Sequence, residues 1–440
     1  MRRLSRRTWI SLPAVIVLAV AGCTEKKLGT NAPVTVAPTV PAPTVPAPTV
    51  PAPTVPAPTV PAPTVTAPAV LASHPAPTPE EYQEFGKKLE AAINAGDQET
   101  ATRLYRTGDL VERCLDSLGL NFDQGSPTAV EQPTMPDLAA QFIGQVHAGG
   151  TFTFLRVVTV DGQPRALIRL ILPDQSVGYH ELMLTRFPDG QIGVQDMFTF
   201  ATGEMLSQSM RRMFLSLGVR TEPGISERLT AWEKLYAQHG SRVVSISNDV
   251  QQGRFEQALS TYRQLPTELK QDRTIQLLGL IAARGIGGDE YVAMLDEVRK
   301  DNRGGTAGDL FSIEYFRLKG QQEECLGCIE RLDEAVGGDP YLTYLRGTIF
   351  FEGARYAGAR AEFEKAIEQE PTIQGAYWSR ITVALKEQNH ADTLDWLQKT
   401  VEKFNVVVEE QDMRANDDYT SFIQSPQFGE FIEWYKSREK

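Results

Sequence analysis

Cysteine and histidine are the side chains of this 440-residue sequence that could carry redox or metal chemistry. Cys325 and Cys328 form a C-x-x-C pair, which in an exported protein can act as a thiol–disulfide couple. In the middle of a helix, Cβ atoms three residues apart lie ~5–6 Å from each other, beyond the ~3.5–4.5 Å that a disulfide needs, whereas the first helical turn permits the bond. We therefore expect two buried cysteines, with a redox pair as the alternative. The five histidines show no metal-ligand spacing, and we expect neither a metal nor another cofactor.

Acid–base chemistry is conceivable at a second place, where polar residues fall on predicted strands. These residues are Arg156, Arg169, His180, Glu181 and Asp196. A histidine and a carboxylate act as acid and base only within hydrogen-bond reach of each other. We expect instead that these side chains form the solvent face of a half-exposed antiparallel sheet. No phosphate-binding loop or nucleophile elbow accompanies them, so the sequence does not predict an enzyme.

The length, composition and net charge of the chain limit the classes of protein to which it can belong. A chain of 440 residues predicts two folded units plus further segments. The content of 41% hydrophobic and 23% charged residues is typical of soluble globular material. A net charge of −12 argues against a nucleic-acid partner, because phosphate binding requires clustered lysine and arginine.

Residues 1–23 have the composition of an export signal. A basic start is followed by an apolar run from Trp9 to Ala21, which is too short to span the ~30 Å hydrocarbon core of a membrane. The segment ends in Val20-Ala21-Gly22-Cys23, which resembles the bacterial lipobox. That resemblance implies lipidation of Cys23 and anchoring in a bacterial membrane of the cell envelope, facing either the periplasm or the outside. A plain secretory signal is the alternative.

Residues 24–78 contain a tandem Pro-Ala-Pro-Thr-Val repeat. Proline fixes φ near −65° and removes a backbone donor, so two prolines in every five residues favour an extended polyproline II segment. From Thr30 to Thr78 such a segment reaches on the order of 140 Å. We interpret it as a spacer between a lipid anchor and a folded unit. A docking ligand for a proline-reading domain and a glycosylated stalk are the alternatives.

Residues 79–218 predict an α+β unit. Helical periodicity covers the first part of the segment, and from Gly150 onwards the apolar residues alternate. Two hairpins are expected, with turns at Asp161-Gly162 and Asp189-Gly190, and together they form a four-stranded antiparallel meander followed by one helix. The layout is similar to the NTF2-like and cystatin-like curved-sheet folds, some of which enclose a pocket.

Residues 225–404 contain an internal repeat of about 34 residues. Its clearest copy is PYLTYLRGTIFFEGARYAGARAEFEKAIEQEP, from Pro340 to Pro371. A position for a small residue recurs at Ala258, Tyr291, Cys325, Ala359 and Thr393, and a large apolar position recurs at Tyr262, Leu295, Ile329, Phe363 and Leu397. The pattern resembles the tetratricopeptide repeat and predicts an all-α solenoid of five helix pairs, with residues 405–440 as a helical cap.

The same resemblance implies a groove lined by the first helix of each pair, which would hold a peptide or a partner protein. Matching positions give the groove residues Arg284, Arg317, Tyr341, Tyr344, Phe351, Trp378 and Lys386. Aromatic residues and arginine are common interface anchors. The alternative is that the aromatic residues pack between helices or under the α+β unit.

The sequence therefore predicts an envelope lipoprotein that acts as a protein-interaction scaffold, with an unidentified envelope protein or peptide as partner. The alternative function is a small-ligand-binding or enzymatic α+β unit that uses the solenoid as a docking arm.

Overall fold

The computed structural model describes residues 75–119, 137–173, 175–221, 227, 229–301 and 305–438. The predicted export signal, Cys23 and the Pro-Ala-Pro-Thr-Val repeats lie outside the described residues. Within the described residues, no helix has the length and the apolar composition needed to cross a membrane.

The α+β unit begins with helices that use their apolar stripes to cover a sheet. They are α1 (Pro79–Ala95), α2 (Gln98–Tyr105), α3 (Thr107–Asp116) and α4 (Leu138–His147). Thr78 and Glu81 form a reciprocal capping box at the start of α1, which satisfies two free backbone N–H groups. The predicted stripe of α1, which includes Phe85, Leu89 and Ile93, is buried.

The sheet is an antiparallel meander in the order β1-β2-β3-β4-β5. Its strands are β1 (Thr151–Val160), β2 (Gln163–Ile171), β3 (Val177–Arg186), β4 (Ile192–Thr199) and β5 (Glu204–Met205). Asp161 and Gly162 have φ values of 52° and 76°, the left-handed turn that matches the twist of a hairpin. The meander is confirmed, but a fifth strand was not expected. Glu204–Met205 pair with β4, so the following helix, α5 (Leu206–Thr221), begins later than the sequence indicates.

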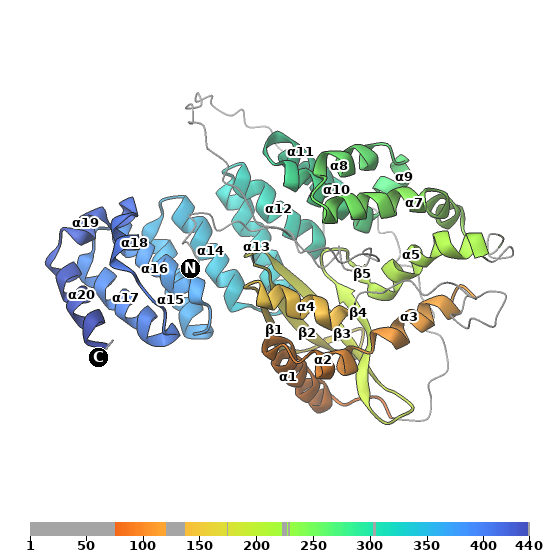
Figure 1. The fold of residues 1–440 in the computed structure, drawn as a ribbon, viewed down its shortest axis with the longest axis horizontal. Coiled ribbons are helices and arrows are strands. Elements are labelled where there is room, and N and C mark those ends of the chain that lie inside the picture. Colours follow the sequence, from red (N-terminus) through yellow and green to blue (C-terminus); the bar gives the residue numbers. More distant parts are fainter. Residues whose placement is uncertain are drawn as a thin grey trace.

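The remaining chain is a helical solenoid (Figure 1). Its five helix pairs are α7 (Ala231–Gln251) with α8 (Phe255–Arg263), α10 (Arg273–Ile286) with α11 (Gly288–Asp301), α12 (Thr306–Leu318) with α13 (Gln322–Val336), α14 (Pro340–Glu352) with α15 (Tyr356–Gln369), and α16 (Gln374–Lys386) with α17 (His390–Phe404). A short helix, α9 (Thr267–Lys270), lies between the first two pairs.

The residues at the predicted repeat positions form the packed interior of this solenoid. All five residues at the small position are buried, and so are the five at the large position. Gly347 in α14 shows why one site admits no side chain, because a Cβ atom there would lie 2.6 Å from the ring of Phe363. The first helix can therefore approach the second closely, which is consistent with a helical-repeat architecture.

The C-terminal segment covers the last helix pair. It consists of α18 (Glu410–Arg414), the 3-10 helix η2 (Asp417–Tyr419), α19 (Thr420–Ile423) and α20 (Pro426–Arg438). Phe422 and Phe431 are fully buried and share one cluster with Ile381 and Leu397 of the last pair. A terminal repeat needs such a cover, because no further repeat follows to bury its apolar face.

The sheet is covered on both faces. One face packs on the helices of its own unit, where the Phe142 and Phe152 rings lie 5.4 Å apart. The other face carries Arg169 and Tyr179, which contact Asp339 of the solenoid. Figure 1 shows the α+β unit lying against the middle of the solenoid, between α7–α11 on one side and α14–α20 on the other.

Candidate partner-binding groove

The first helices of consecutive pairs form one row, which we call the groove face and define as α10, α12, α14 and α16. α14 and α16 contact each other, and an ion pair between Arg317 and Glu352 joins α12 to α14, as expected on the inner side of a curved solenoid. Arg284, Arg317 and Lys386 lie on α10, α12 and α16. The described part of the chain therefore places the three predicted basic residues on one row of helices.

Charged side chains link neighbouring helices along this face. Nε and Nη2 of Arg317 donate to the Glu352 carboxylate over distances of 2.6–3.0 Å, which joins α12 to α14. Nη1 of Arg317 lies 3.6 Å from Oε2 of Glu314, one turn earlier on α12. At the end of α16, Nζ of Lys386 donates to Asp418 of η2 over 3.0 Å. The face is thus an alternation of acids and bases and not a purely basic rim.

Glu314 is the buried member of this row, with only 3% of its surface exposed. Burial raises the pKa of its carboxyl to about 7, although the guanidinium groups of Arg317 and Arg284 oppose the shift. Among the described residues Oε2 accepts no hydrogen bond, and Nη1 of Arg317 lies 3.6 Å from it. Burial therefore favours the protonated, neutral form of Glu314 at the base of the groove face.

Two of the predicted aromatic groove residues are not at the surface. Tyr341 is 1% exposed and Tyr344 is 2% exposed. The Tyr341 hydroxyl donates to the carbonyl of Gln175 in the α+β unit over 2.8 Å, and the Tyr344 ring packs between Tyr341 and Phe363. The expectation that these two side chains face an open groove is wrong, because the α+β unit covers Tyr341 and Tyr344 packs between helices of the solenoid.

The other two aromatic residues are half-buried. Phe351 packs on Tyr356 where α14 turns into α15, with ring centroids 5.6 Å apart. Trp378 packs against the cluster that the C-terminal cap completes. Each therefore combines a packed body with a partly exposed edge, and their role in binding a partner stays a prediction.

The polar strand residues do not form a solvent face, so that expectation is also wrong. Arg169 is buried and pairs with Asp339 and Glu370 of the solenoid. Arg156 donates to the carbonyls of Gly337 and Gly338 at the end of α13. The reason is that the solenoid covers this side of the sheet, which a sequence pattern does not reveal.

His180 and Asp196 are not brought together as an acid–base pair. His180 lies opposite Thr199 in the sheet, whereas Asp196 lies opposite Met183. Burial lowers the pKa of His180 to about 4, and its ring packs on Phe142 at 5.8 Å. Asp196 accepts hydrogen bonds from the backbone N–H and hydroxyl of Ser207, at 3.1 and 2.5 Å, and so caps the start of α5. Glu181 forms an ion pair with Arg165 at 2.7 Å.

The C-x-x-C cysteines are buried thiols in α13. Burial raises the pKa of Cys325 to about 12 and that of Cys328 to about 11. The Cys325 thiol donates to the Ile313 carbonyl over 3.4 Å. A thiolate is the reactive form of cysteine, and these surroundings disfavour it. Among the described residues, no group of three or more histidine, cysteine or acidic side chains could hold a metal ion.

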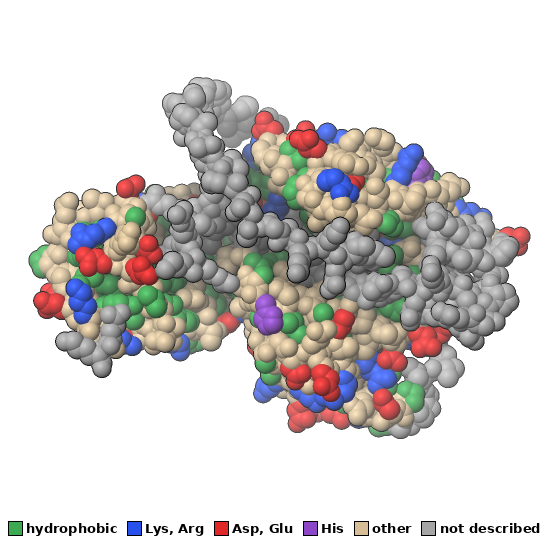
Figure 2. All heavy atoms as spheres, viewed as in Figure 1, with side chains coloured by type: hydrophobic (Ala, Val, Ile, Leu, Met, Phe, Trp, Pro, Cys, Tyr) green, Lys and Arg blue, Asp and Glu red, His purple; other side chains and the backbone are tan. Residues whose placement is uncertain are grey.

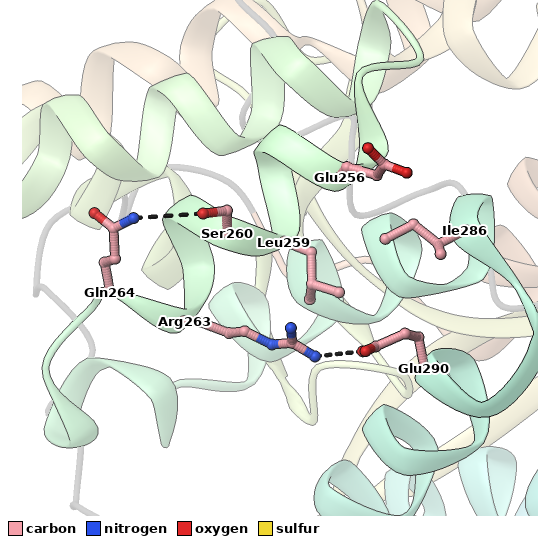
Figure 3. A pocket seen from close by; sticks show the side chains of 7 residues that line it. All are labelled: Glu256, Leu259, Ser260, Arg263, Gln264, Ile286 and Glu290. Carbon is pink, nitrogen blue, oxygen red and sulfur yellow. Dashed lines mark hydrogen bonds and ion pairs between the residues drawn. The ribbon is translucent and has the colours of Figure 1, made fainter.

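A hollow of about 430 Å³ lies on the outer side of α8, α10 and α11 (Figure 3). Arg263 donates to Glu290 across it, and Gln264 donates to Ser260 along one side, at the end of α8. The hollow is open; of the groove face only Ile286, the last residue of α10, lines it, and none of the polar strand residues does. It offers no set of unpaired polar groups converging on a ligand.

Four acidic residues of these contacts were not predicted from the sequence: Glu314, Glu352, Asp339 and Glu370. Asp339 carries a recognisable signal, since it directly precedes the proline that starts α14. The others resemble ordinary surface acids in the sequence.

No protein-family model matches the chain, and no curated protein shows significant similarity to it.

Proposed function

We propose that this chain is a lipid-anchored lipoprotein of a bacterial envelope and a protein-interaction scaffold, with tetratricopeptide-like repeats as the binding element. The observation that carries the proposal is the groove face, a continuous row of first helices with partly exposed Arg317, Phe351 and Trp378. Arginine and aromatic side chains are the usual anchors of protein interfaces. The lipidated Cys23 and the proline-rich spacer would hold this face away from the membrane.

The assignment to tetratricopeptide-like repeats rests on period and packing. The first helices begin after Asp272, Gly305 and Asp339, which are 33 and 34 residues apart. Small residues recur where the two helices of a pair cross, with Tyr291 of the second pair as the exception, and large apolar residues recur one turn later. A pair of helices of this size cannot bury its own apolar face, so repetition supplies the core.

A ligand-binding or enzymatic α+β unit is the alternative function. It would need an accessible cavity that holds polar groups such as His180 and Asp196 together. His180 is enclosed by packing, and Asp196 is occupied by Ser207. These two observations favour the scaffold.

Site-specific photo-crosslinking of the full-length protein in intact envelopes tests this function. A photoreactive residue would replace Phe351 or Lys386 on the groove face, and Lys365 on the outer helix α15 serves as the matched control. We expect a discrete crosslinked partner from the two groove positions and none from position 365. Crosslinks of equal yield from all three positions, or from position 365 alone, would contradict the proposal.

A further inference from the structure

Two first helices of the solenoid are attached to the α+β unit by the same device. In α10 and in α14, the residue before the helix is an aspartate whose side chain caps the helix, namely Asp272 and Asp339. Each of these aspartates also pairs with an arginine of the α+β unit, Arg212 or Arg169. One carboxylate therefore caps the N-terminus of a solenoid helix and also binds the α+β unit.

The α14 junction is almost completely enclosed. Oδ1 of Asp339 accepts from the Tyr341 N–H at 3.0 Å and from Nη1 of Arg169 at 2.5 Å, while Oδ2 accepts from the Tyr179 hydroxyl at 2.6 Å. Glu370, just after α15, accepts from both terminal nitrogens of Arg169, at 2.6 and 2.9 Å. Burial disfavours the charge of Arg169, but the two carboxylates outweigh that effect and its pKa is raised.

The α10 junction repeats the pattern with other residues. Nε of Arg212 lies 3.4 Å from Oδ2 of Asp272, and Nη2 donates to Glu204 of β5. The Thr274 hydroxyl, in the first turn of α10, donates to Glu204 over 2.9 Å. Nη1 of Arg273 donates to the Thr202 carbonyl over 3.3 Å. The beginning of α10 is thus bound at several points to the segment that joins β4 to α5.

The two junctions skip one repeat. Asp272 and Asp339 belong to the second and fourth helix pairs, and the equivalent position in the third pair is Gly305. Glycine has no side chain, and α12 has no side-chain cap. The α+β unit therefore holds the helix N-termini of two repeats that are not neighbours in the solenoid, whereas Arg156 contacts the third pair at the end of α13.

This arrangement has a mechanical consequence. In a solenoid each repeat contacts only its neighbours, so the overall curvature is a sum of small rotations between repeats. A folded unit that is bound to two non-adjacent repeats closes a ring of contacts. It therefore fixes the total rotation between those two repeats. The contacting aspartates are hydrogen-bonded to the first backbone N–H groups of α10 and α14. The contacts with the arginines therefore fix the positions of these two helices.

We propose that the α+β unit is a brace, which sets the distance between α10 and α14 and thereby the curvature of the groove face. Arg169 and Arg212 are its positioning residues. The use of this curvature in partner binding rests on the proposed function, but the brace itself is measured without a partner, so the two can fail separately.

Double electron–electron resonance on the full-length chain tests the brace. Spin labels would be attached to cysteines introduced at Ile286 and Ala354, which are exposed at the far ends of α10 and α14. The three cysteines of the described residues are buried, and Cys23 is replaced by serine in every labelled protein, so the introduced cysteines react selectively. In Arg169→Met/Arg212→Met we expect the width of the distance distribution to increase roughly twofold. The lysine variants at both positions keep the charge and should retain a narrower distribution than the methionine variants.

Arg254→Met is the matched control. Arg254 pairs with buried Asp249, but both residues belong to the first helix pair, so the loss of this contact should leave the α10–α14 distance unchanged. If the double methionine variant does not fold, Arg212→Met alone is measured, because Arg212 retains 13% side-chain exposure and its junction is less enclosed. An unchanged distribution in a folded junction variant, or equal broadening in Arg254→Met, would overturn the proposal.

Discussion

Glu314 shows how a single buried carboxyl links the groove face to pH. The unfolded chain releases this proton near pH 4.5, whereas the folded protein holds it until about pH 7. Between these values the folded state binds more protons than the unfolded state, so the contribution of Glu314 to stability falls as the pH rises. The free energy of unfolding is therefore expected to decrease from pH 5 to pH 8 on account of this group.

Replacement of Glu314 by glutamine removes this titration. We expect Glu314→Gln to stabilise the protein relative to the wild type at pH 8 by up to about 3 kcal/mol, and by much less at pH 5. Urea denaturation at the two pH values measures the difference. Glu368→Gln, on an exposed position of α15, is the control and should change stability equally at both. A pH-independent effect of Glu314→Gln would show that Glu314 is ionised throughout.

At the residue scale, the sequence predicted the place of a residue within the repeat better than the residues that surround it in the fold. Ala258, Cys325 and Ala359 were placed correctly because a repeat register depends only on spacing along the chain. Tyr341 and Arg169 were misplaced, since each is buried by a segment more than 160 residues away. No local pattern contains information about such a contact.

The helix pair is the element that decides the fold of the C-terminal half. Helical period, a recurring small position at the crossing of the two helices and a large apolar residue one turn later all favour the same structure, and so five pairs could be predicted from the sequence. The short elements β5 and α9 were missed because two or four residues carry no periodicity of their own. The hairpins were predictable because their turns need residues that tolerate positive φ.

Phe363 tests this account of the helix pair. It is fully buried between α14 and α15, so Phe363→Ala leaves a cavity and should destabilise the protein by roughly 3–5 kcal/mol. Val407→Ala is the control, because Val407 is 77% exposed and its truncation should change the unfolding free energy by less than about 0.5 kcal/mol. Equal effects of the two substitutions in urea denaturation would contradict the repeat packing.

At the scale of the whole molecule, the order of segments could be predicted but not their assembly. The sequence indicated an α+β unit followed by a solenoid, and the structure places them against each other, with the sheet between its own helices and the solenoid. Figure 2 shows charged side chains of both signs spread over the visible face of the described residues, without a large basic field.

Anchoring through Cys23 is the prediction that concerns the whole molecule most directly. Metabolic labelling with an alkyne fatty acid should mark the full-length protein, and Cys23→Ser should lose the label and leave the membrane fraction. The Cys23→Ser protein should keep its thermal unfolding temperature, because residue 23 precedes both folded units. A wild-type protein that is exported and cleaved without acquiring the label would identify a plain secretory signal.

The central claim is that the groove face binds a partner, and a charge exchange tests it most directly. Arg317→Glu combined with Glu352→Arg keeps an ion pair between α12 and α14 but reverses the charges that a partner meets, and Glu314→Gln is added so that no second carboxylate lies beside position 317. The exchanged protein, with the photoreactive residue at position 386, is compared with the wild type in intact envelopes. We expect an unchanged thermal unfolding temperature and loss of the crosslinked partner. A folded charge-exchange variant that still yields the same crosslink would contradict the account.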